Sequence, residues 1–220
     1  MKPELVTKLA ISGLTIVSTV MLYRAFRRRM RNIVFLGQAY DEHGHRTPWA
    51  GVSLGNSGGA NTIGAAGCVE TSITMAYNSY NTDAPMTPDV ANEIIRNNGG
   101  FAAGSADMFI EKGANALGMD MPANMHLSAP RSLSEIIPVM NKVITDGAMA
   151  LLRVFHGKNP VGGDHTVLLY GGGAGEYYAA DPALARSIKF DANLISVDGG
   201  AKWGAKVPYR CIGVVALYNS

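Results

Sequence analysis

The sequence contains little cysteine, and it lacks the short motifs that usually hold zinc. Its 220 residues include only two cysteines, Cys68 and Cys211, so a scaffold built on several disulfide bonds is excluded. A single bridge between the two is the alternative to a catalytic use of Cys68. Neither a Cys-x-x-Cys pair nor a His-Glu-x-x-His motif occurs. We therefore expect neither a metal nor a cofactor.

Charge is also scarce, and it is unevenly spread along the chain. Residues 1–32 hold seven of the 19 Lys and Arg residues and one of the 17 Asp and Glu residues. The rest carries 12 basic and 16 acidic side chains, which is not the basic surface of a nucleic-acid-binding domain. We expect no nucleic-acid partner. The composition predicts two parts, a head over residues 1–32 and one domain over residues 33–220.

The head combines an apolar run with a cluster of arginines. Counted from Leu5, the run reaches Tyr23 and holds 19 residues, close to the roughly 20 that a spanning helix needs. Five of the next eight residues are arginines, and no Ala-x-Ala cleavage site of a secretory signal is present. We expect residues 5–31 to associate with a membrane. The alternative is a helix that packs on another protein or lies on a surface.

Helical patterns dominate the first half of the remaining chain. Residues 51–67 are rich in Gly, Asn and Ser and are expected to form a loop. The helices expected after this loop cover residues 68–80, 88–97 after a capping threonine, 106–117, and a segment that begins at Ser132. Ser132 and Glu135 match a capping box, and Pro138 predicts a kink or a later start. On the first helix, one buried face is expected to hold Val69, Ser72, Ile73, Ala76 and Tyr77.

Short segments rich in β-branched and aromatic residues dominate the second half. The strands expected from them cover residues 150–155, 165–170, 176–180, 187–190 and 212–218. Gly-rich turns separate them, including one at residues 171–175 that lacks the Lys-Ser/Thr helix of a phosphate loop. Helices followed by antiparallel strands predict an α+β fold.

Cys68 directly follows Gly-Ala-Ala-Gly and opens a predicted helix. The partial positive charge at a helix N-terminus stabilises a thiolate and lowers its pKa, as a cysteine nucleophile requires. The alternative is a buried, inert cysteine.

A predicted hairpin supplies the base that such a nucleophile needs. If the hairpin is symmetric about Gly173, His165 lies directly opposite Asp181, and both side chains share one face. The carboxylate can then orient the imidazole, as in a catalytic triad. The alternative is a hairpin end with two exposed polar residues.

Elsewhere, His43 and His45 beside Glu42 are residues of the types that bind metal ions, but a polar loop is the simpler interpretation.

The segment Gly67-Cys68-Val69-Glu70-Thr71-Ser72 resembles the signature of papain-like cysteine peptidases related to bacteriocin-processing peptidases. Further matching residues occur in the same order along the chain: Gln38, Asp41, Trp49, Leu54-Gly55-Asn56-Ser57, Thr62-Ile63-Gly64, Thr87-Pro88-Asp89, Asn98-Gly99-Gly100, His165 and Asp181-Pro182. The resemblance implies a papain-like fold with Cys68 as nucleophile, His165 as base and Asp181 as its orienting group. It also implies that Gln38 donates a side-chain N–H to the oxyanion hole.

Glu70 departs from this family pattern, which has a small, apolar or proline residue at that position. The simpler interpretation is a carboxylate that favours the helix dipole. The alternative is a general acid for glycan cleavage, as in a lytic transglycosylase or muramidase.

The chain as a whole resembles the virion lysins of the enveloped double-stranded-RNA bacteriophages, the cystoviruses. The resemblance rests on the length, the apolar and Arg-rich head, and the single peptidase-like domain. It implies an enzyme that lies between nucleocapsid and envelope and degrades host peptidoglycan in the periplasm, both as the phage penetrates and at host lysis. Residues 5–31 would then contact the envelope or a host membrane, and the nucleocapsid surface is another expected partner. A third hypothesis is a membrane-anchored structural virion protein without activity.

Overall fold

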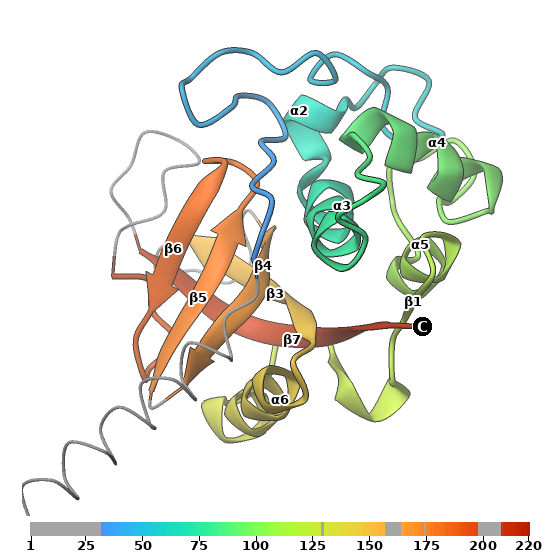
Figure 1. Ribbon diagram of the computed structural model, residues 1–220. Coiled ribbons are helices and arrows are strands. Elements are labelled where there is room, and N and C mark those ends of the chain that lie inside the picture. Colours follow the sequence, from blue (N-terminus) through green and yellow to red (C-terminus); the bar gives the residue numbers. More distant parts are fainter. Residues whose placement is uncertain (1–31, 129, 157–163, 174, 198–207) are drawn as a thin grey trace, which may run out of the picture.

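The computed structural model describes residues 32–128, 130–156, 164–173, 175–197 and 208–220. Helices occupy the first half of this chain and most strands the second (Figure 1). In chain order the elements are α2 (Ile63–Ala66), α3 (Cys68–Tyr80), α4 (Pro88–Asn97), α5 (Ile110–Ala116), β1 (Met119–Asp120), the 3₁₀ turn η1 (Ala123–Met125), β2 (His126–Leu127), α6 (Leu133–Asp146), β3 (Met149–His156), β4 (Asp164–Gly173), β5 (Glu176–Asp181), β6 (Arg186–Phe190) and β7 (Tyr209–Asn219).

The strands form one antiparallel sheet of seven strands. Their order is β1-β7-β3-β4-β5-β6, and β2 also pairs with β7. The helices α2 to α5 gather at one side of this sheet, and α6 lies apart from them (Figure 1). The α+β prediction is therefore confirmed. The five long strands coincide with the five predicted ones, and each is longer than predicted.

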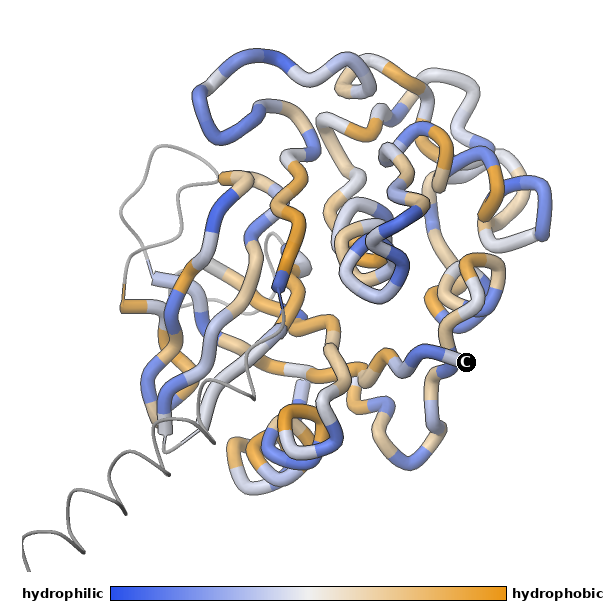
Figure 2. The backbone as a smooth tube through the Cα atoms, in the orientation of Figure 1, coloured by the Kyte–Doolittle hydropathy of each residue, from blue (hydrophilic) through white to orange (hydrophobic). Residues whose placement is uncertain are grey.

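The sheet is buried on both faces because apolar residues follow one another along its central strands. In β3, Ala150, Leu152 and Val154 join a core cluster with α6, while Met149 and Leu151 join a second cluster with α3. Successive side chains of a strand point to opposite faces, so a continuous apolar run serves both. Figure 2 shows hydrophobic residues along β3 and β7, and hydrophilic ones along the outer loop that precedes α2.

Helix α3 has the predicted bounds but is buried more completely than one apolar face would allow. Glu70, Thr71 and Thr74 are buried together with Ile73, whereas Val69, from the predicted face, is only partly covered. The helix packs against β3 and β4 on one side and against α4 and α5 on others. The hydroxyl of Thr74 donates to the carbonyl of Glu70 at 2.9 Å, and this local bond allows a polar residue to be buried.

Two segments differ from prediction: one expected loop contains a short helix, and one expected helix begins later. The loop expected at residues 51–67 contains α2, whose cap Thr62 accepts a hydrogen bond from the backbone of Ala65. The helix expected at residues 106–117 begins only at Ile110, because Phe101 and Met108 form an antiparallel bridge just before it. In both segments, a hydrogen bond or bridge between residues three to seven positions apart sets where the helix begins.

The predicted cap is present at the start of α6 but not at the start of α4. The capping box of Ser132 and Glu135 is present, and α6 continues through Pro138 without the later start that the proline suggested. At α4 the side chain of Thr87 makes no capping bond, so Pro88 marks the start without it.

All of the predicted head except Asn32 lies outside the described residues, including residues 5–31, for which the sequence predicts membrane association. Within the part of the chain that is described, no helix combines the length and hydrophobicity that crossing a membrane requires. The boundary between head and domain therefore stays a prediction.

Candidate active site

Cys68 is the first residue of α3, as predicted. Only Gly67 separates α2 from α3, and a Cβ atom at Gly67 would lie 2.6 Å from the carbonyl oxygen of Ile63. The sharp turn between the two helices therefore requires glycine. It leaves Cys68 in the first turn of α3. The backbone N–H groups of this turn have no partner within the helix, and they point toward the N-terminus, where Cys68 lies. The residue is 8% exposed and lines a cavity, so Cys68 is sheltered but borders open space.

His165 and Asp181 are in contact, although the predicted register is wrong. His165 Nε2 lies 2.7 Å from Asp181 Oδ1, and both side chains are fully buried. The β4–β5 ladder pairs Leu168 with Ala180, so its continuation places Asp181 opposite Val167 and diagonal to His165. Near the turn, the pairing of Gly173 with Glu176 is off by three residues from the prediction, and a bulge between Leu169 and Gly171 reduces the error to two. The error is two residues, and an even shift preserves the face on which a side chain lies.

The electrostatics of the site favour a charged thiol–imidazole pair. Burial lowers the pKa of His165, but hydrogen bonds with Asp181 and with Cys68 outweigh it, and the pKa rises from 6.5 to about 9. Asp181 occupies Nε2, so Nδ1 is the ring nitrogen that remains for the thiol. The negative charges of Asp181 and Cys68 raise the pKa further. At neutral pH this arrangement supports an imidazolium beside a thiolate.

Asp181 also supports the turn that follows it. Its Oδ1 accepts the backbone N–H of Ala183 at 2.8 Å, in addition to the bond from His165. The ring of Tyr209 lies at a centroid distance of 5.5 Å from the His165 ring. The imidazole is thus held at its edge by a carboxylate and over its surface by an aromatic ring.

Gln38 lies between the two halves of the site. Its backbone N–H donates to the carbonyl of Pro182, next to Asp181, and its side-chain Nε2 donates to the carbonyl of Gly64 in α2. The side chain is 2% exposed. A carboxamide nitrogen carries two hydrogens, so the bond to Gly64 leaves one for an oxyanion. The structure thus places Gln38 near the start of α3, and its role as an oxyanion donor stays a prediction.

Glu70 lies two residues after Cys68 on α3, but it lines a different cavity. The group is 1% exposed and accepts hydrogen bonds from the hydroxyls of Thr71 and Thr74 at 3.3 and 3.2 Å. Burial raises its pKa well above the ordinary value, and the charges of Asp89 and Cys68 add to this effect. A protonated Glu70 is neutral, so it does not oppose the Cys68 thiolate as a carboxylate would.

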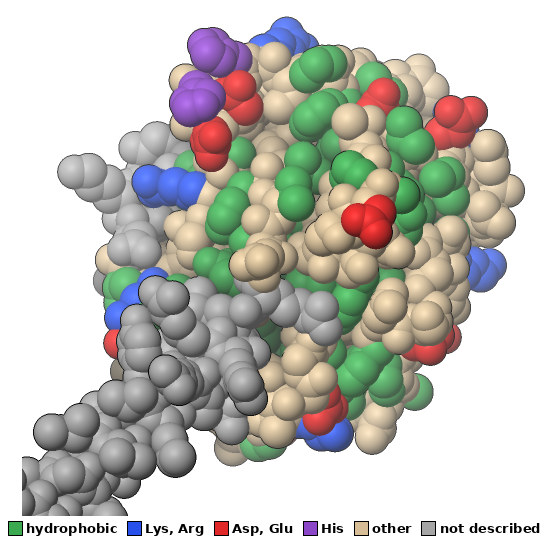
Figure 3. Space-filling view, viewed as in Figure 1, with side chains coloured by type: hydrophobic (Ala, Val, Ile, Leu, Met, Phe, Trp, Pro, Cys, Tyr) green, Lys and Arg blue, Asp and Glu red, His purple; other side chains and the backbone are tan. Residues whose placement is uncertain are grey.

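The polar loop at His43 and His45 binds its own acidic neighbours. His43 lies 3.5 Å from Glu42 and His45 lies 3.3 Å from Asp41, and all four side chains are substantially exposed (Figure 3). Within the described ranges, no group of three His, Cys, Asp or Glu side chains is placed to hold a metal ion. The prediction of a polar loop agrees with this arrangement.

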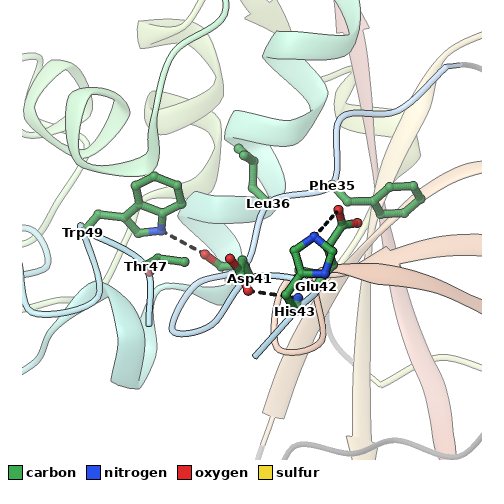
Figure 4. A pocket seen from close by; sticks show the side chains of 9 residues that line it. Phe35, Leu36, Asp41, Glu42, His43, Thr47 and Trp49 are labelled. Atoms are coloured by element: carbon green, nitrogen blue, oxygen red, sulfur yellow. Dashed lines mark hydrogen bonds and ion pairs between the residues drawn. The ribbon is translucent and has the colours of Figure 1, made fainter. Parts of the chain in front are cut away.

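A cavity of about 320 Å³ opens beside this loop, close to Gln38. Its wall includes His43, Asp41 and Trp49, and the indole N–H of Trp49 donates to the carbonyl of Gly37 at 2.8 Å (Figure 4). This bond fixes the backbone immediately before Gln38. The cavity is separate from the one that Cys68 lines.

Residues that the sequence interpretation did not identify also contribute to the site. Arg153 and Thr166 line the cavity beside Cys68, and the hydroxyl of Ser72 donates to the Thr166 carbonyl at 3.4 Å, which joins α3 to β4. Arg153 is the only charged residue within an otherwise apolar run in β3. A lone charge in an apolar strand is the sequence signal that could have marked Arg153 as a candidate site residue.

No protein-family model matches this chain, and no curated protein matches it. The site is therefore defined by its geometry: a thiol at a helix start, an imidazole that interacts with it, and a buried carboxylate that holds the imidazole.

Proposed function

We propose that this protein is a cysteine endopeptidase that cuts the peptide cross-links of bacterial peptidoglycan. The observation that carries the proposal is the 2.7 Å contact between Asp181 and His165, whose pKa is also raised by an interaction with the Cys68 thiol at the start of α3. Such a group of three activates a nucleophile for acyl transfer. The choice of peptidoglycan rests on the sequence resemblance to bacteriocin-processing-type peptidases and to cystovirus lysins.

The proposed reaction assigns a role to each of these side chains. The Cys68 thiolate attacks the carbonyl carbon of the scissile amide, and His165 Nδ1 gives its proton to the leaving amine. The resulting thioester is hydrolysed by a water molecule that His165 deprotonates, and the carboxylic acid product leaves. Asp181 holds the imidazole through Nε2 and stabilises its charge. The Gln38 side chain and backbone N–H groups at the start of α3 stabilise the developing oxyanion.

Product analysis of digested peptidoglycan tests the proposal directly. Purified sacculi incubated with the full chain should release new primary amines, because each cut cross-link exposes one. New reducing or anhydro sugar ends without amines would instead indicate cleavage of the glycan strand. Release of neither would favour the non-enzymatic hypothesis of a structural virion protein.

Glu70 supports a second candidate function, cleavage of glycan strands by general acid catalysis. Its pKa is raised well above the ordinary value, and its residue lines a cavity of about 300 Å³. A carboxyl group that stays protonated at neutral pH can donate a proton to a glycosidic oxygen. Such an enzyme would be a lytic transglycosylase or muramidase.

The substitution Glu70→Gln separates the two candidates. For a cysteine peptidase we expect activity to change by about twofold or less, because a neutral amide replaces a neutral carboxyl group of the same shape. A thermal unfolding curve checks that the buried hydrogen bonds to Thr71 and Thr74 tolerate the amide. Loss of lysis in a variant that remains folded would assign catalysis to Glu70.

We further propose that the chain acts as a phage lysin whose head attaches it to a lipid surface. A chain that starts at residue 33 keeps Phe35, whose ring packs edge-on against Tyr170 at 6.1 Å, so we expect it to fold and to degrade murein. In liposome flotation the full chain should float and the truncated chain should not. A full-length variant with the five head arginines changed to glutamine shows whether binding depends on charge or on the apolar run. It should still float if the apolar run inserts, and it should not float if the arginines bind the lipid. An aggregated truncated chain would indicate that the head belongs to the domain.

A further inference from the structure

The cavity beside the Cys68 thiol is lined mainly by apolar side chains. It measures about 300 Å³, and Val69, Ile110, Leu151 and Val215 contribute to its wall together with Cys68. A surface of this kind covers aliphatic carbon and excludes water from the region next to the nucleophile.

Arg153 introduces a positive charge into this apolar wall. It lies on β3 with its side chain on the same face as Leu151, and its Nη1 donates to the carbonyl of Ser128 at 2.9 Å. Among the described residues that line the cavity, it is the only one with a permanently charged side chain. A guanidinium group has five N–H donors in a planar fork, and this fork matches the two oxygens of a carboxylate.

The backbone around Arg153 is built to hold the guanidinium in this place. Gly213 pairs with Arg153 across the β3–β7 ladder, and a Cβ atom there would lie 2.6 Å from the carbonyl oxygen of Leu127. The absence of a side chain at Gly213 therefore lets the segment that carries Ser128 approach β3. The carbonyl of Ser128 can reach Arg153 because of this close approach.

The neighbouring cavity has the opposite electrostatic character. It shares Val69 and Ile110 with the Cys68 cavity, and the ionisable residues in its lining, Glu70 and Asp107, are both acidic. A carboxylate beside Cys68 is therefore attracted toward Arg153 and disfavoured toward the side on which Asp107 lies. This difference gives the site a direction along which an acidic ligand is oriented.

We propose that Arg153 recognises a free carboxylate on an aliphatic residue next to the bond that Cys68 attacks. The apolar wall contacts the aliphatic carbons, and the guanidinium binds the carboxylate. The substrate class is an acidic peptide, such as murein stem peptides with a dicarboxylic diamino acid. This inference rests on the proposed peptidase function and specifies the substrate that the same site prefers.

Two synthetic cross-linked stem peptides test the inference. They differ only in whether the carboxylate of the aliphatic residue is free or converted to a carboxamide. The full chain should cut the free acid with a kcat/KM about tenfold or more above that for the amide. Arg153→Gln should remove this preference by slowing cleavage of the acid alone. Arg153→Lys should retain part of it, because a lysine keeps the charge but not the planar fork. Arg96→Gln, which removes an exposed arginine from α4, should change neither rate.

Binding to the Cys68→Ala chain separates this inference from the peptidase proposal, because that chain cannot turn over either peptide. If the wild type cuts neither peptide but Cys68→Ala binds the acid more tightly in an Arg153-dependent manner, the peptidase proposal fails and the carboxylate site stands. Equal binding and equal cleavage of both peptides by the wild type overturn the carboxylate site. An equal loss of cleavage rate for both peptides in a folded Arg153→Gln variant also overturns it. If Arg153→Gln unfolds on thermal melting, the wild-type preference and its partial retention in Arg153→Lys decide the question.

Discussion

Replacing Cys68 by alanine should abolish lysis of Gram-negative cells whose outer membrane has been opened with chloroform. The loss should be on the order of 10⁴-fold or more, because removal of the nucleophile leaves the other catalytic groups without a function. The fold should survive, since the change removes a single sulfur atom from a residue that lines a cavity. The measurement is the rate of turbidity decrease at equal protein concentration, with a melting curve for each variant.

Cys211 provides the matched control for this experiment. It is buried in β7, its thiol donates to the carbonyl of Gly213, and burial raises its pKa to about 12. Both cysteines are free thiols, so the alternative of a bridge between them does not occur. Cys211→Ala should therefore keep the catalytic rate, with some loss of stability from the cavity it leaves. A Cys68→Ala chain that clears cells at the wild-type rate would contradict the thiol mechanism and make Glu70 the leading candidate.

Replacing Asp181 by asparagine should lower activity about tenfold or more, equivalent to about 1.4 kcal/mol in barrier height. The amide can still accept the bonds from Ala183 and from the imidazole, so the turn should remain. It cannot stabilise the imidazolium, since it carries no charge. Asp120→Asn in β1, at the opposite edge of the sheet from β6, is the control and should leave the rate unchanged.

The pH profile gives this variant a second, independent measurement. Raising the pH through the pKa of His165 removes the proton that the leaving amine needs, so kcat/KM should fall on the alkaline side near pH 9. The hydrogen bond and charge of Asp181 raise that pKa, so Asp181→Asn should move the alkaline limb toward the ordinary value of 6.5. An unchanged limb together with an unchanged rate would mean that Asp181 only supports the turn through Ala183.

Much of the site could be predicted because its residues stand at points where local rules are strong. Gly67 before Cys68 marks a helix start, and the predicted bounds of α3 agree with the structure. His165 and Asp181 come together although the predicted pairing was wrong by two residues. The strand period of two explains this outcome, because it preserves the face under any even shift. A shift of one residue would have separated the two side chains.

Other properties of the site depend on contacts between distant parts of the chain. Glu70 was interpreted either as a carboxylate at the helix dipole or as a general acid, and its raised pKa follows from burial under neighbouring elements. Arg153 gains its place beside Cys68 only because β3, α3 and the segment at Ser128 converge there. Neither the burial nor the convergence has a local signal in the sequence.

The sequence by itself determined the α+β order, the helix start at Cys68 and the faces of the strands, because glycine turns and apolar periodicity act over a few residues. Tertiary structure alone decided the β4–β5 register, the raised pKa of Glu70 and the place of Arg153 beside Cys68. These properties depend on bulges, burial and electrostatic distances, which arise only when separate elements pair and pack together.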